Sequence, residues 1–368
     1  MHAFFAVCPP GLRSLCRREL TGLDADIQDI QQVPGGVSFS CKPVDAFLAA
    51  LWLRSPSRIY MRIARFKADR FAILEKKILA VDWELFLPAG TDPAIQVTTR
   101  TSRLYHSDAV ADRCRPIIQA ALKSEPSQNP GAQTVMVRAE NDRFEISLDL
   151  SGPPLFKRGI KHRVADAPLR ENLAFALLDA AGFTADDVLV DPMCGSGTFS
   201  IEGAMVQALI PAGFFRTFAF EAWPAFSAAG FGHAKSQAAK NFSPAGPVFA
   251  SDLDPEAMAA LKANLAGQPF LAPVTACQQD FFAIVPERLT PKKGVVVLNP
   301  PYGRRIGKNR DTAVFYREIM AKLAADFKGW RVALVFPGNH LPKMVQLRLQ
   351  PFHFFHGGLD LTAGIGIV

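Results

Sequence analysis

The chain has 368 residues, of which 49% are hydrophobic and 20% are charged. This composition is typical of globular proteins, and the length allows two or three domains with buried cores. The sequence contains no run of about 18 consecutive apolar residues, and no basic segment precedes the apolar residues at the N-terminus. These features argue against a membrane protein and a secreted one, so we expect a cytoplasmic protein.

Charge and cysteine usage narrow the function classes further. Residues 1–164 contain 23 Lys and Arg against 17 Asp and Glu, whereas residues 165–368 contain 18 against 17. A basic half joined to a nearly neutral half suits a nucleic-acid-binding region attached to a catalytic one, although such a surplus also serves solubility alone. The six cysteines show no Cys-x-x-Cys pair and no zinc-type His spacing. We therefore expect reduced thiols and no metal.

The first half alternates short strands and helices. Strands are expected at residues 4–8, 36–41, 57–66, 94–99, 135–139 and 144–150, and helices at residues 11–23, 43–55 and 108–123. The last two strands flank a polar tetrapeptide at residues 140–143, which is a hairpin signal. The run Ser151-Gly152-Pro153-Pro154 interrupts the pattern, and we place a domain boundary after residue 152.

The second half has a strand–helix rhythm. Strands are expected at residues 188–191, 248–252, 274–280, 294–299 and 331–337, and helices at residues 198–209, 255–265 and 311–327. This alternation predicts an α/β domain with a mostly parallel sheet. The pair Gly357-Gly358 lies between two strand-like runs and predicts a terminal antiparallel hairpin. Residues 211–247, which are rich in Phe, Ala and Pro, have the composition of an insertion.

A glycine-rich turn follows the first strand of the second half and reads Asp191-Pro192-Met193-Cys194-Gly195-Ser196-Gly197-Thr198. Glycines let the backbone approach a ligand, and a helix start offers free N–H groups to a carboxylate or phosphate. A dinucleotide fingerprint would need a third glycine three positions on and an acid about 20 residues later. The third glycine is instead Gly203 and the next strand-end acid is Asp252, which disfavours a nicotinamide cofactor.

Three acids end three successive predicted strands: Asp191, Asp252 and Asp280. Ligands bind at this carboxyl edge in open α/β sheets. Asp252, with Leu253 beside it, could accept both hydroxyls of a ribose, and Asp280 could accept an adenine amino group with Phe281 against the ring. Each acid taken alone is more simply a helix cap. Taken together, they predict an adenosine-containing ligand.

The most specific motif is Asn299-Pro300-Pro301-Tyr302, which ends another predicted strand. An amino group on a base is a poor nucleophile, because its lone pair is delocalised into the ring. The Asn299 amide oxygen and the Pro300 carbonyl can both accept its hydrogens, since consecutive prolines fix the backbone and lack N–H groups. Tyr302 offers a ring for stacking on an extruded base. With the turn and the acids, this motif predicts methyl transfer from S-adenosylmethionine to an exocyclic nitrogen.

Cys194 has two interpretations. A cysteine near a methyl donor could be a nucleophile, as in enzymes that methylate a pyrimidine carbon. However, Cys194 lies inside the turn assigned to the cofactor, where a small buried thiol is the ordinary finding. We reject the nucleophile.

These motifs, together with Lys157-Arg158-Gly159-Ile160 and Ala167-Pro168-Leu169-Arg170-Glu171-Asn172-Leu173-Ala174, resemble those of the THUMP-domain RNA guanine-N2 methyltransferases. The segments 82–88 and 102–107 are similar to the THUMP pattern of that family. The resemblance implies a ferredoxin-like segment at residues 1–45, a THUMP-like RNA-binding domain at 46–152 and a Rossmann-like methyltransferase domain at 153–368. No second methyltransferase module is evident, as in the single-activity members.

The resemblance implies a product, partners and site residues. The product is N2-methylguanine in 23S ribosomal RNA, and the partner is that RNA or a precursor of the large ribosomal subunit. Segment 157–173 would cover the cofactor. Catalytic contacts fall on Asn299, Pro300, Pro301 and Tyr302. Cofactor contacts fall on Asp191, Pro192, Cys194, Gly195, Ser196, Gly197, Asp252, Leu253, Asp280, Phe281 and Asn299. We assign RNA contacts to basic residues of the first half, namely Arg58, Arg62, Arg65, Lys67, Arg100 and Arg103.

Several alternatives stay open at this level. The Asn-Pro-Pro-Tyr motif also occurs in enzymes that methylate adenine N6 in DNA or glutamine amides in release factors, and the basic first half argues against both. Transfer RNA is the second candidate substrate. A non-catalytic RNA-binding or ribosome-assembly protein is the candidate from another class, and binding of the methyl donor would separate it from an enzyme.

Overall fold

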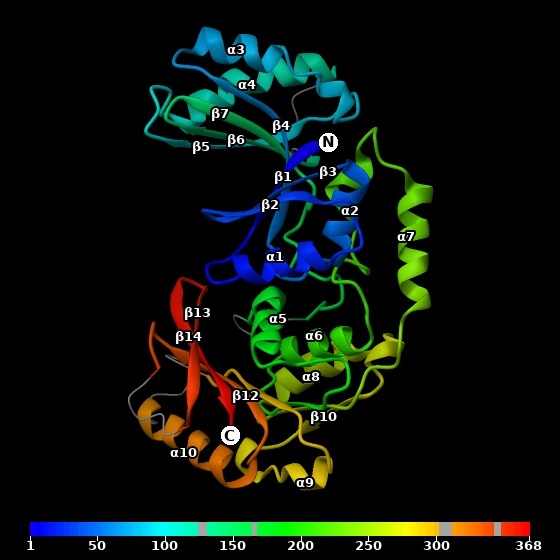
Figure 1. Cartoon of the computed structure of the whole chain (residues 1–368), viewed down its shortest axis with the longest axis vertical. Coiled ribbons are helices and arrows are strands. Elements are labelled where there is room, and N and C mark those ends of the chain that lie inside the picture. The colour runs from blue at the N-terminus through cyan, green and yellow to red at the C-terminus, as the bar shows by residue number, and fades with distance from the viewer. Residues whose placement is uncertain (124–130, 164–167, 302–310, 342–346) are drawn as a thin grey trace. The chain divides into compact units, whose positions relative to one another are not determined.

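The computed structural model of the chain describes residues 1–123, 131–163, 168–301, 311–341 and 347–368 (Figure 1). The chain forms two compact units. Unit 1 comprises Met1–Cys8, Cys16–Leu155 and Arg216–Ser236, and unit 2 comprises Pro9–Leu15, Phe156–Phe215 and Gln237–Val368. The chain therefore passes between the units several times.

Unit 1 is built on one seven-stranded sheet with the order β2-β3-β1-β4-β7-β6-β5, in which only β5 and β6 are parallel. Its strands are β1 His2–Val7, β2 Gln28–Val33, β3 Gly36–Cys41, β4 Arg58–Lys67, β5 Pro93–Arg100, β6 Gly131–Glu140 and β7 Arg143–Asp149. Its helices are α2 Pro43–Trp52, α3 Phe71–Leu79 and α4 Ser107–Leu122, with short 3-10 turns η1 Trp83–Leu85 and η2 Ala219–Ala222. Helix α1 Arg13–Gly22 begins in unit 2 and ends in unit 1. A single sheet thus carries both the ferredoxin-like and the THUMP-like sequence patterns.

The two faces of this sheet differ in polarity. Phe4 in β1 and Val137 in β6 are fully buried, as are Leu74 of α3 and Ile118 of α4. In Figure 1, α3 and α4 lie together along one face of β4, β7, β6 and β5. The alternate residues of these strands are mostly charged and lie on the other face, because side chains alternate between the faces of a strand.

Residues 216–236, within the predicted insertion, belong to unit 1. Phe220 stacks on Phe47 of α2 with ring centroids 4.2 Å apart, and Trp223 lies 6.3 Å from the same ring. The Trp223 indole donates to the buried Gln133 of β6, and the Gln133 amide donates to the backbone carbonyl of Ala219. The Phe-rich composition of the segment therefore serves an aromatic cluster inside unit 1.

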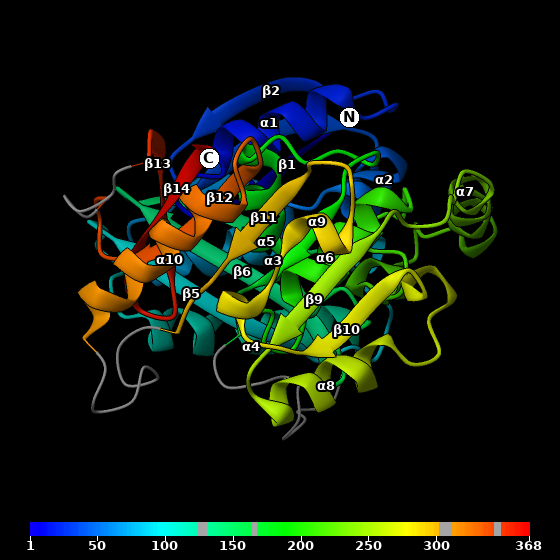
Figure 2. The ribbon, with the colours of Figure 1, turned by 90° about the horizontal axis from the view of Figure 1, so that it is seen from below.

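Unit 2 is built on a second seven-stranded sheet with the order β10-β9-β8-β11-β12-β14-β13 (Figure 2). Its strands are β8 Leu189–Asp191, β9 Val248–Asp252, β10 Val274–Gln278, β11 Val295–Leu298, β12 Arg331–Pro337, β13 Leu349–His356 and β14 Leu359–Ile367. Its helices are α5 Glu171–Ala180, α6 Thr198–Gln207, α8 Pro255–Leu265, α9 Pro286–Leu289 and α10 Thr312–Asp326; α7 Ala228–Lys240 begins in unit 1 and ends in unit 2. The 3-10 turns are η3 Pro269–Leu271 and η4 Phe281–Ala283.

The central strands of unit 2 are buried on both faces. All four residues of β11 are apolar and buried, as expected for a parallel strand covered by helices on both sides. Val296 and Leu298 pack in a cluster with Ile319 of α10. On α6, a Cβ added at Gly203 would lie 2.4 Å from Leu189 of β8, so glycine allows this helix to approach the sheet closely. Strands β8 to β12 are parallel, and β12, β14 and β13 are antiparallel.

The predicted α/β fold with its terminal hairpin is confirmed, and most predicted elements lie within a few residues of the observed ones. One strand was predicted too long: β10 ends at Gln278, and Asp280 instead caps η4. Helix α6 ends at Gln207, and Leu209 follows it with a φ of 56°. Among the described helices, none is both long and apolar enough to cross a membrane.

Candidate active site

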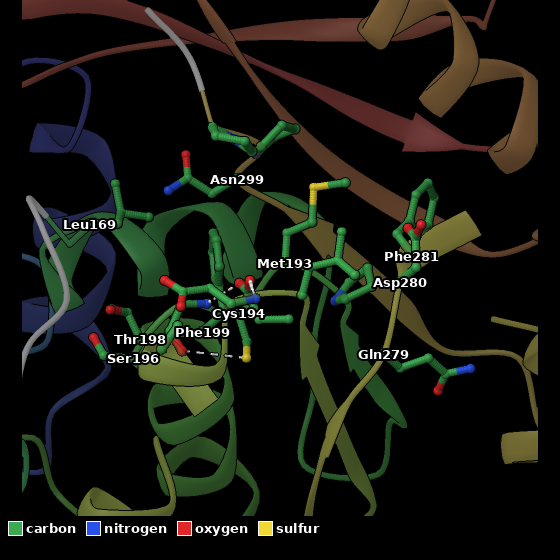
Figure 3. Close-up of a pocket in the computed structure, with 18 of the residues that line it drawn as sticks. Leu169, Met193, Cys194, Ser196, Thr198, Phe199, Gln279, Asp280, Phe281 and Asn299 are labelled. Atoms are coloured by element: carbon green, nitrogen blue, oxygen red, sulfur yellow. Dashed lines mark hydrogen bonds between the residues drawn. The ribbon is translucent and has the colours of Figure 1, made fainter. Parts of the chain in front are cut away.

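The strands of unit 2 end around a cavity of about 560 Å³ at the carboxyl edge of the parallel sheet (Figure 3). The turn after β8, the ends of β9 and β11 and the segment after β10 all contribute to it. The predicted residues that line it are Pro192, Cys194, Gly195, Ser196, Asp252, Leu253, Asp280, Phe281, Asn299, Pro300 and Pro301. Asp191 and Gly197 are not in direct contact with the cavity, and Tyr302 lies outside the described residues.

The turn between β8 and α6 depends on two glycines with positive φ. Gly195 has a φ of 54°, and a Cβ added there would meet no atom within 4 Å, so the turn leaves open space beside its backbone. Gly197 has a φ of 84°, and a Cβ there would lie 2.3 Å from Leu261 of α8. Gly195 therefore leaves room for a ligand, whereas Gly197 allows close packing.

Asp191 is fully buried at the end of β8. Its Oδ2 accepts hydrogen bonds from the Ser200 backbone N–H at 3.1 Å and from the Ser200 hydroxyl at 2.6 Å. Its Oδ1 is buried and has no hydrogen-bond partner among the described residues. Burial raises the pKa of this carboxyl to about 7 despite the hydrogen bonds from Ser200. Asp191 thus offers an unused acceptor beneath the turn.

Asp252 at the end of β9 holds the glycine turn in place. Its Oδ2 accepts from the Gly195 backbone N–H at 2.9 Å, and its Oδ1 accepts from the Asp254 backbone N–H at 3.0 Å. Asp254, not Asp252, is the N-cap of α8, since it accepts from the Glu256 backbone N–H at 2.9 Å. Each Asp252 oxygen keeps further lone pairs that are able to accept from a ligand hydroxyl.

Asp280 and the aromatic residues after it form another side of the cavity. The Asp280 side chain accepts from the Phe282 backbone N–H at 3.0 Å, so the capping interpretation holds for this acid, although it is wrong for Asp252. Phe281 is 2% exposed and packs in the core of unit 2, with its ring 6.0 Å from that of Phe327. Phe282, which the sequence analysis did not select, is partly buried and lines the same cavity.

Asn299 follows β11 directly and contributes to the cavity beside the two prolines. Its Oδ1 is buried and has no hydrogen-bond partner within the described part of the chain. Figure 3 shows the Asn299 amide at the cavity together with Met193 and Ser196. The Ser196 hydroxyl is likewise buried without such a partner. An unpaired buried acceptor costs on the order of 1–3 kcal/mol, so both atoms are expected to meet a ligand.

Cys194 packs its sulfur 3.9 Å from Met258 Sδ and 3.5 Å from the Gly195 carbonyl oxygen. The residue is 7% exposed. Burial, with nearby Asp191 and Asp252, raises the pKa of the Cys194 thiol far above its ordinary value. A thiolate nucleophile is not favoured here.

The segment that precedes α5 is attached to the glycine turn by residues that the sequence analysis missed. Asn264 of α8 accepts from the backbone N–H groups of His162 and Arg163, both at 2.9 Å, and donates to the Ser196 carbonyl at 3.4 Å. The Lys161 ammonium donates to the Thr198 hydroxyl at 2.7 Å and pairs with Glu171 at 3.5 Å. These contacts support the expectation that this segment lies near the cofactor.

The residues predicted to bind RNA all lie in unit 1. Arg62, Arg65, Lys67 and Arg100 are on β4 and β5. Arg58 has an internal partner, because its guanidinium pairs with the buried Asp149. Arg103 lies after β5 and pairs with Asp69 at 3.0 Å. The predicted set therefore does not form a single cluster.

The acceptors at this edge are able to hold an adenosine, and the glycine turn leaves room beside its backbone. No group of three or more His, Cys, Asp and Glu residues arranged for a metal ion occurs in the parts of the chain described above. A mostly parallel sheet with a terminal antiparallel hairpin and this cavity defines the S-adenosylmethionine-dependent methyltransferases. The crystal structure of SMU.472, "a putative methyltransferase complexed with SAH", superposes with a TM-score of 0.85 at 26% identity and covers 100% of this chain and 98% of that one.

Comparison with known families identifies the chain more closely. A family model described as "RMKL-like, methyltransferase domain" matches residues 158–363, and one described as "RlmL ferredoxin-like domain" matches residues 3–60. The chain belongs to the RMKL-like methyltransferase family, and its cofactor is S-adenosylmethionine.

Named relatives cover nearly the whole chain. "Putative RNA methyltransferase slr0064" of Synechocystis sp. is 32% identical over 98% of this chain and 95% of the relative. Ribosomal RNA large subunit methyltransferase K/L of Methylococcus capsulatus is 30% identical over 96% of this chain and 50% of the relative. The chain thus spans about half the length of the K/L relatives that it matches.

Proposed function

We propose that the chain is an RNA methyltransferase that forms N2-methylguanine in 23S ribosomal RNA. The observation that carries the proposal is the buried, unpartnered Oδ1 of Asn299 beside Pro300 in the cofactor cavity. The relatives named as ribosomal RNA and RNA methyltransferases support RNA as the substrate. The choice of guanine N2 rests on the resemblance of the motifs. The same proposal includes a ferredoxin-like segment at residues 1–45, a THUMP-like domain at 46–152 and a methyltransferase domain at 153–368, within which residues 216–236 pack with unit 1.

Cofactor binding in this proposal uses the atoms that the protein leaves unpaired. The Ser196 hydroxyl would meet the polar methionine end of the cofactor beside the open turn at Gly195. The buried Asp191 does not line the cavity and would act indirectly, by holding the start of α6 through Ser200. Asp252 would accept from the ribose hydroxyls, and Asp280 from the adenine amino group. Leu253 and Phe282, which both line the cavity, would contact the apolar faces of the adenine. The bound cofactor supplies an electrophilic methyl group.

Asn299 and Pro300 would act on the target nitrogen. Each would accept one hydrogen of the exocyclic amino group, which localises the nitrogen lone pair and aims it at the methyl carbon. As the new N–C bond forms, the S–C bond breaks, and the nitrogen releases one proton to solvent. A base in a helix must first be extruded, at a cost of a few kcal/mol, so partly unfolded or early-assembly RNA is expected to be the better substrate.

The test is methyl transfer from labelled S-adenosylmethionine to total RNA from a deletion strain. Digestion of the product should give label in N2-methylguanosine, and fractionation should place it in 23S RNA. Label in N6-methyladenosine would contradict the base, and label confined to transfer RNA would favour the second candidate substrate. Cofactor binding without transfer to any RNA would favour a non-catalytic assembly protein.

A further inference from the structure

The open face of the unit 1 sheet, opposite α3 and α4, carries two rows of charged residues across four strands. In the first row, Arg65 of β4 is in register with Glu145 of β7, which is in register with Arg138 of β6. In the second row, Lys67 is in register with Arg143, Arg143 with Glu140, and Glu140 with Arg100 of β5. Side chains directly across strands share a face, so both rows lie on this face.

Apart from the Arg58–Asp149 ion pair, cations outnumber carboxylates on this face by six to two. The cations are Arg62, Arg65, Lys67, Arg100, Arg138 and Arg143, and the carboxylates are Glu140 and Glu145. Arg65, Arg138 and Arg100 have side-chain exposures of 62%, 53% and 81%. The excess positive charge on this face is therefore accessible to a polyanion.

The two carboxylates orient guanidinium groups but do not neutralise them. Glu145 accepts from Arg62 Nε at 2.9 Å and from Arg65 Nε at 2.9 Å, so one carboxylate holds two arginines. Glu140 accepts from Arg138 at 2.9 Å and lies 3.8 Å from Arg100. A guanidinium has five N–H donors, so each fixed arginine keeps donors for phosphate oxygens. Fixing the side chains beforehand lowers the entropic cost of binding.

One pair on this face is unfavourable for the free protein. Lys67 lies directly across from Arg143, and neither forms an ion pair within the described residues. Like charges directly opposite each other destabilise a sheet. A face that served only stability or solubility would gain from an acid at either position. Two adjacent cations such as Lys67 and Arg143 are expected if this face binds an anion when the protein functions.

The same face is hollowed and includes an aromatic ring. A groove of about 960 Å³ is lined by Phe5, Arg62, Arg65, Lys67, Arg138 and Arg143, among others. The guanidinium of Arg62 lies 5.1 Å above the centre of the Phe5 ring. Positive grooves with an aromatic platform are a general means of holding unpaired nucleic-acid strands.

We propose that this face of unit 1 is the RNA-docking surface, and that it grips the phosphate backbone of an unpaired strand through Arg65, Lys67, Arg138 and Arg143. This rests on the proposed function and adds to it a location, an RNA form and two new contact residues, Arg138 and Arg143. It also removes Arg58 from the predicted contacts, because the buried Asp149 neutralises it.

The test compares two double variants of the full chain. Arg138→Ser with Arg143→Ser removes two cations from the face, and Arg17→Ser with Lys76→Ser removes two exposed cations from α1 and α3. Binding of labelled polyuridine and of a labelled RNA hairpin is measured against salt concentration. The face variant should bind polyuridine several-fold more weakly, with a slope of log affinity against log salt that is less negative by about 0.7 per cation removed. The control should match the wild type, and both variants should melt as it does.

The results that would contradict the docking surface differ from those that would contradict the proposed function. Unchanged polyuridine affinity in the face variant, an equal loss in the control, or displacement of polyuridine by polyglutamate at equal charge would overturn the docking surface. Tighter binding of the hairpin than of polyuridine would overturn the unpaired form. Methyl transfer to total RNA is measured on the same wild-type preparation. If the wild type transfers methyl groups and the face variant binds normally, only the docking surface fails; if the wild type transfers none, the proposed function fails.

Discussion

The two sheets of the molecule have the same number of strands but place their functional groups differently. In unit 2 the central strands are parallel and buried on both faces, so polar side chains appear only where strands end, as with Asp252 and Asn299. In unit 1 the strands are mostly antiparallel and helices lie along one face, so charged residues such as Arg65 and Arg138 spread over the other face. Strand direction thus favours a small enclosed site in one unit and a broad exposed surface in the other.

This difference predicts distinct consequences of substitution. At the edge of the unit 2 sheet, each polar side chain is expected to have its own chemical role, so its removal should cause a large loss of activity. On the open face of unit 1, the proposed RNA contacts are distributed over several residues, so the loss of a single one should have a small effect.

Asn299→Ala tests the edge site most strongly. We expect kcat to fall on the order of 10²-fold or more, the scale for one interaction made in the transition state, because the target nitrogen loses an acceptor. The affinities for S-adenosylmethionine and RNA should change little, which calorimetry and RNA titration would verify. Asn299→Gln, which retains the amide on a longer stem, is the control for geometry. A residual rate close to that of the wild type would make Asn299 a structural residue.

Gly197→Ala and Gly195→Ala form a matched pair within the cofactor turn. Both substitutions place alanine at positive φ, at about 1–2 kcal/mol of backbone strain. Gly197→Ala also forces a contact with Leu261 and should lower the melting temperature more. Gly195→Ala meets no protein atom but projects beside the cavity, so it should weaken S-adenosylmethionine binding more than it weakens stability. Equal melting temperatures would contradict the packing role of Gly197.

Arg216→Ala tests whether the inserted segment supports unit 1. The Arg216 guanidinium donates to the backbone carbonyls of Ser151 and Pro154, both at 2.7 Å, so its removal leaves buried acceptors unpaired. We expect about 1–3 kcal/mol of lost stability in thermal unfolding, and no change in S-adenosylmethionine affinity. Arg216→Lys should recover only part of the stability, because an ammonium cannot reproduce the planar fork. Weakened cofactor binding in a folded Arg216→Ala variant would contradict this division of roles.

The stability of the protein should also depend on pH through Asp191. Its pKa is raised from 3.8 to about 7 in the folded protein, so the folded state favours the protonated form. The stability that this provides is complete below about pH 4 and is lost as the pH rises through 7. The free energy of unfolding should therefore fall across this window, by at most about 1.4 kcal/mol per pH unit. Denaturant titrations of Asp191→Asn should lack this slope; an identical slope would assign it to another group.

The fold was predictable where local signals were strong. Helix α8 was predicted with its observed bounds, because Asp254 caps it and Pro255 occupies its first turn. Strand β2 was missed because it is a polar edge strand without apolar alternation. Helix α3 was missed because it has nine residues and its N-cap residue, Arg70, makes no side-chain capping bond. Strand β2 is held by pairing with β3, and α3 by its buried Leu74 and Ile78, so neither element is specified strongly by its own sequence.

The residues of the candidate site were likewise predictable where a local sequence pattern marked them. Each strand-end acid follows an apolar run, and the Asn299 motif is a contiguous tetrapeptide, so local patterns pointed to both. The structure brings Asp252, Asp280 and Asn299 to one cavity. Asn264 was not predictable, because its partners His162 and Arg163 lie 102 and 101 positions away and no local pattern links them. Phe281 was selected as the ring for the cofactor because it follows Asp280. Phe281 lines the cavity but is 2% exposed, whereas Phe282 beside it is only partly buried, and sequence adjacency does not distinguish the two rings.

Because residues 216–236 pack in unit 1, the chain cannot be cut between the units into two fragments that each keep a complete core. A fragment that stops at residue 155 would lose Phe220 and Trp223, and would expose Phe47 and Gln133 to water. Such a fragment is expected to aggregate, whatever its affinity for RNA. The same continuity constrains evolution, since neither unit can be exchanged by a single recombination event. Inheritance of the two units is therefore coupled, and substitutions in the aromatic cluster should be compensated within the cluster.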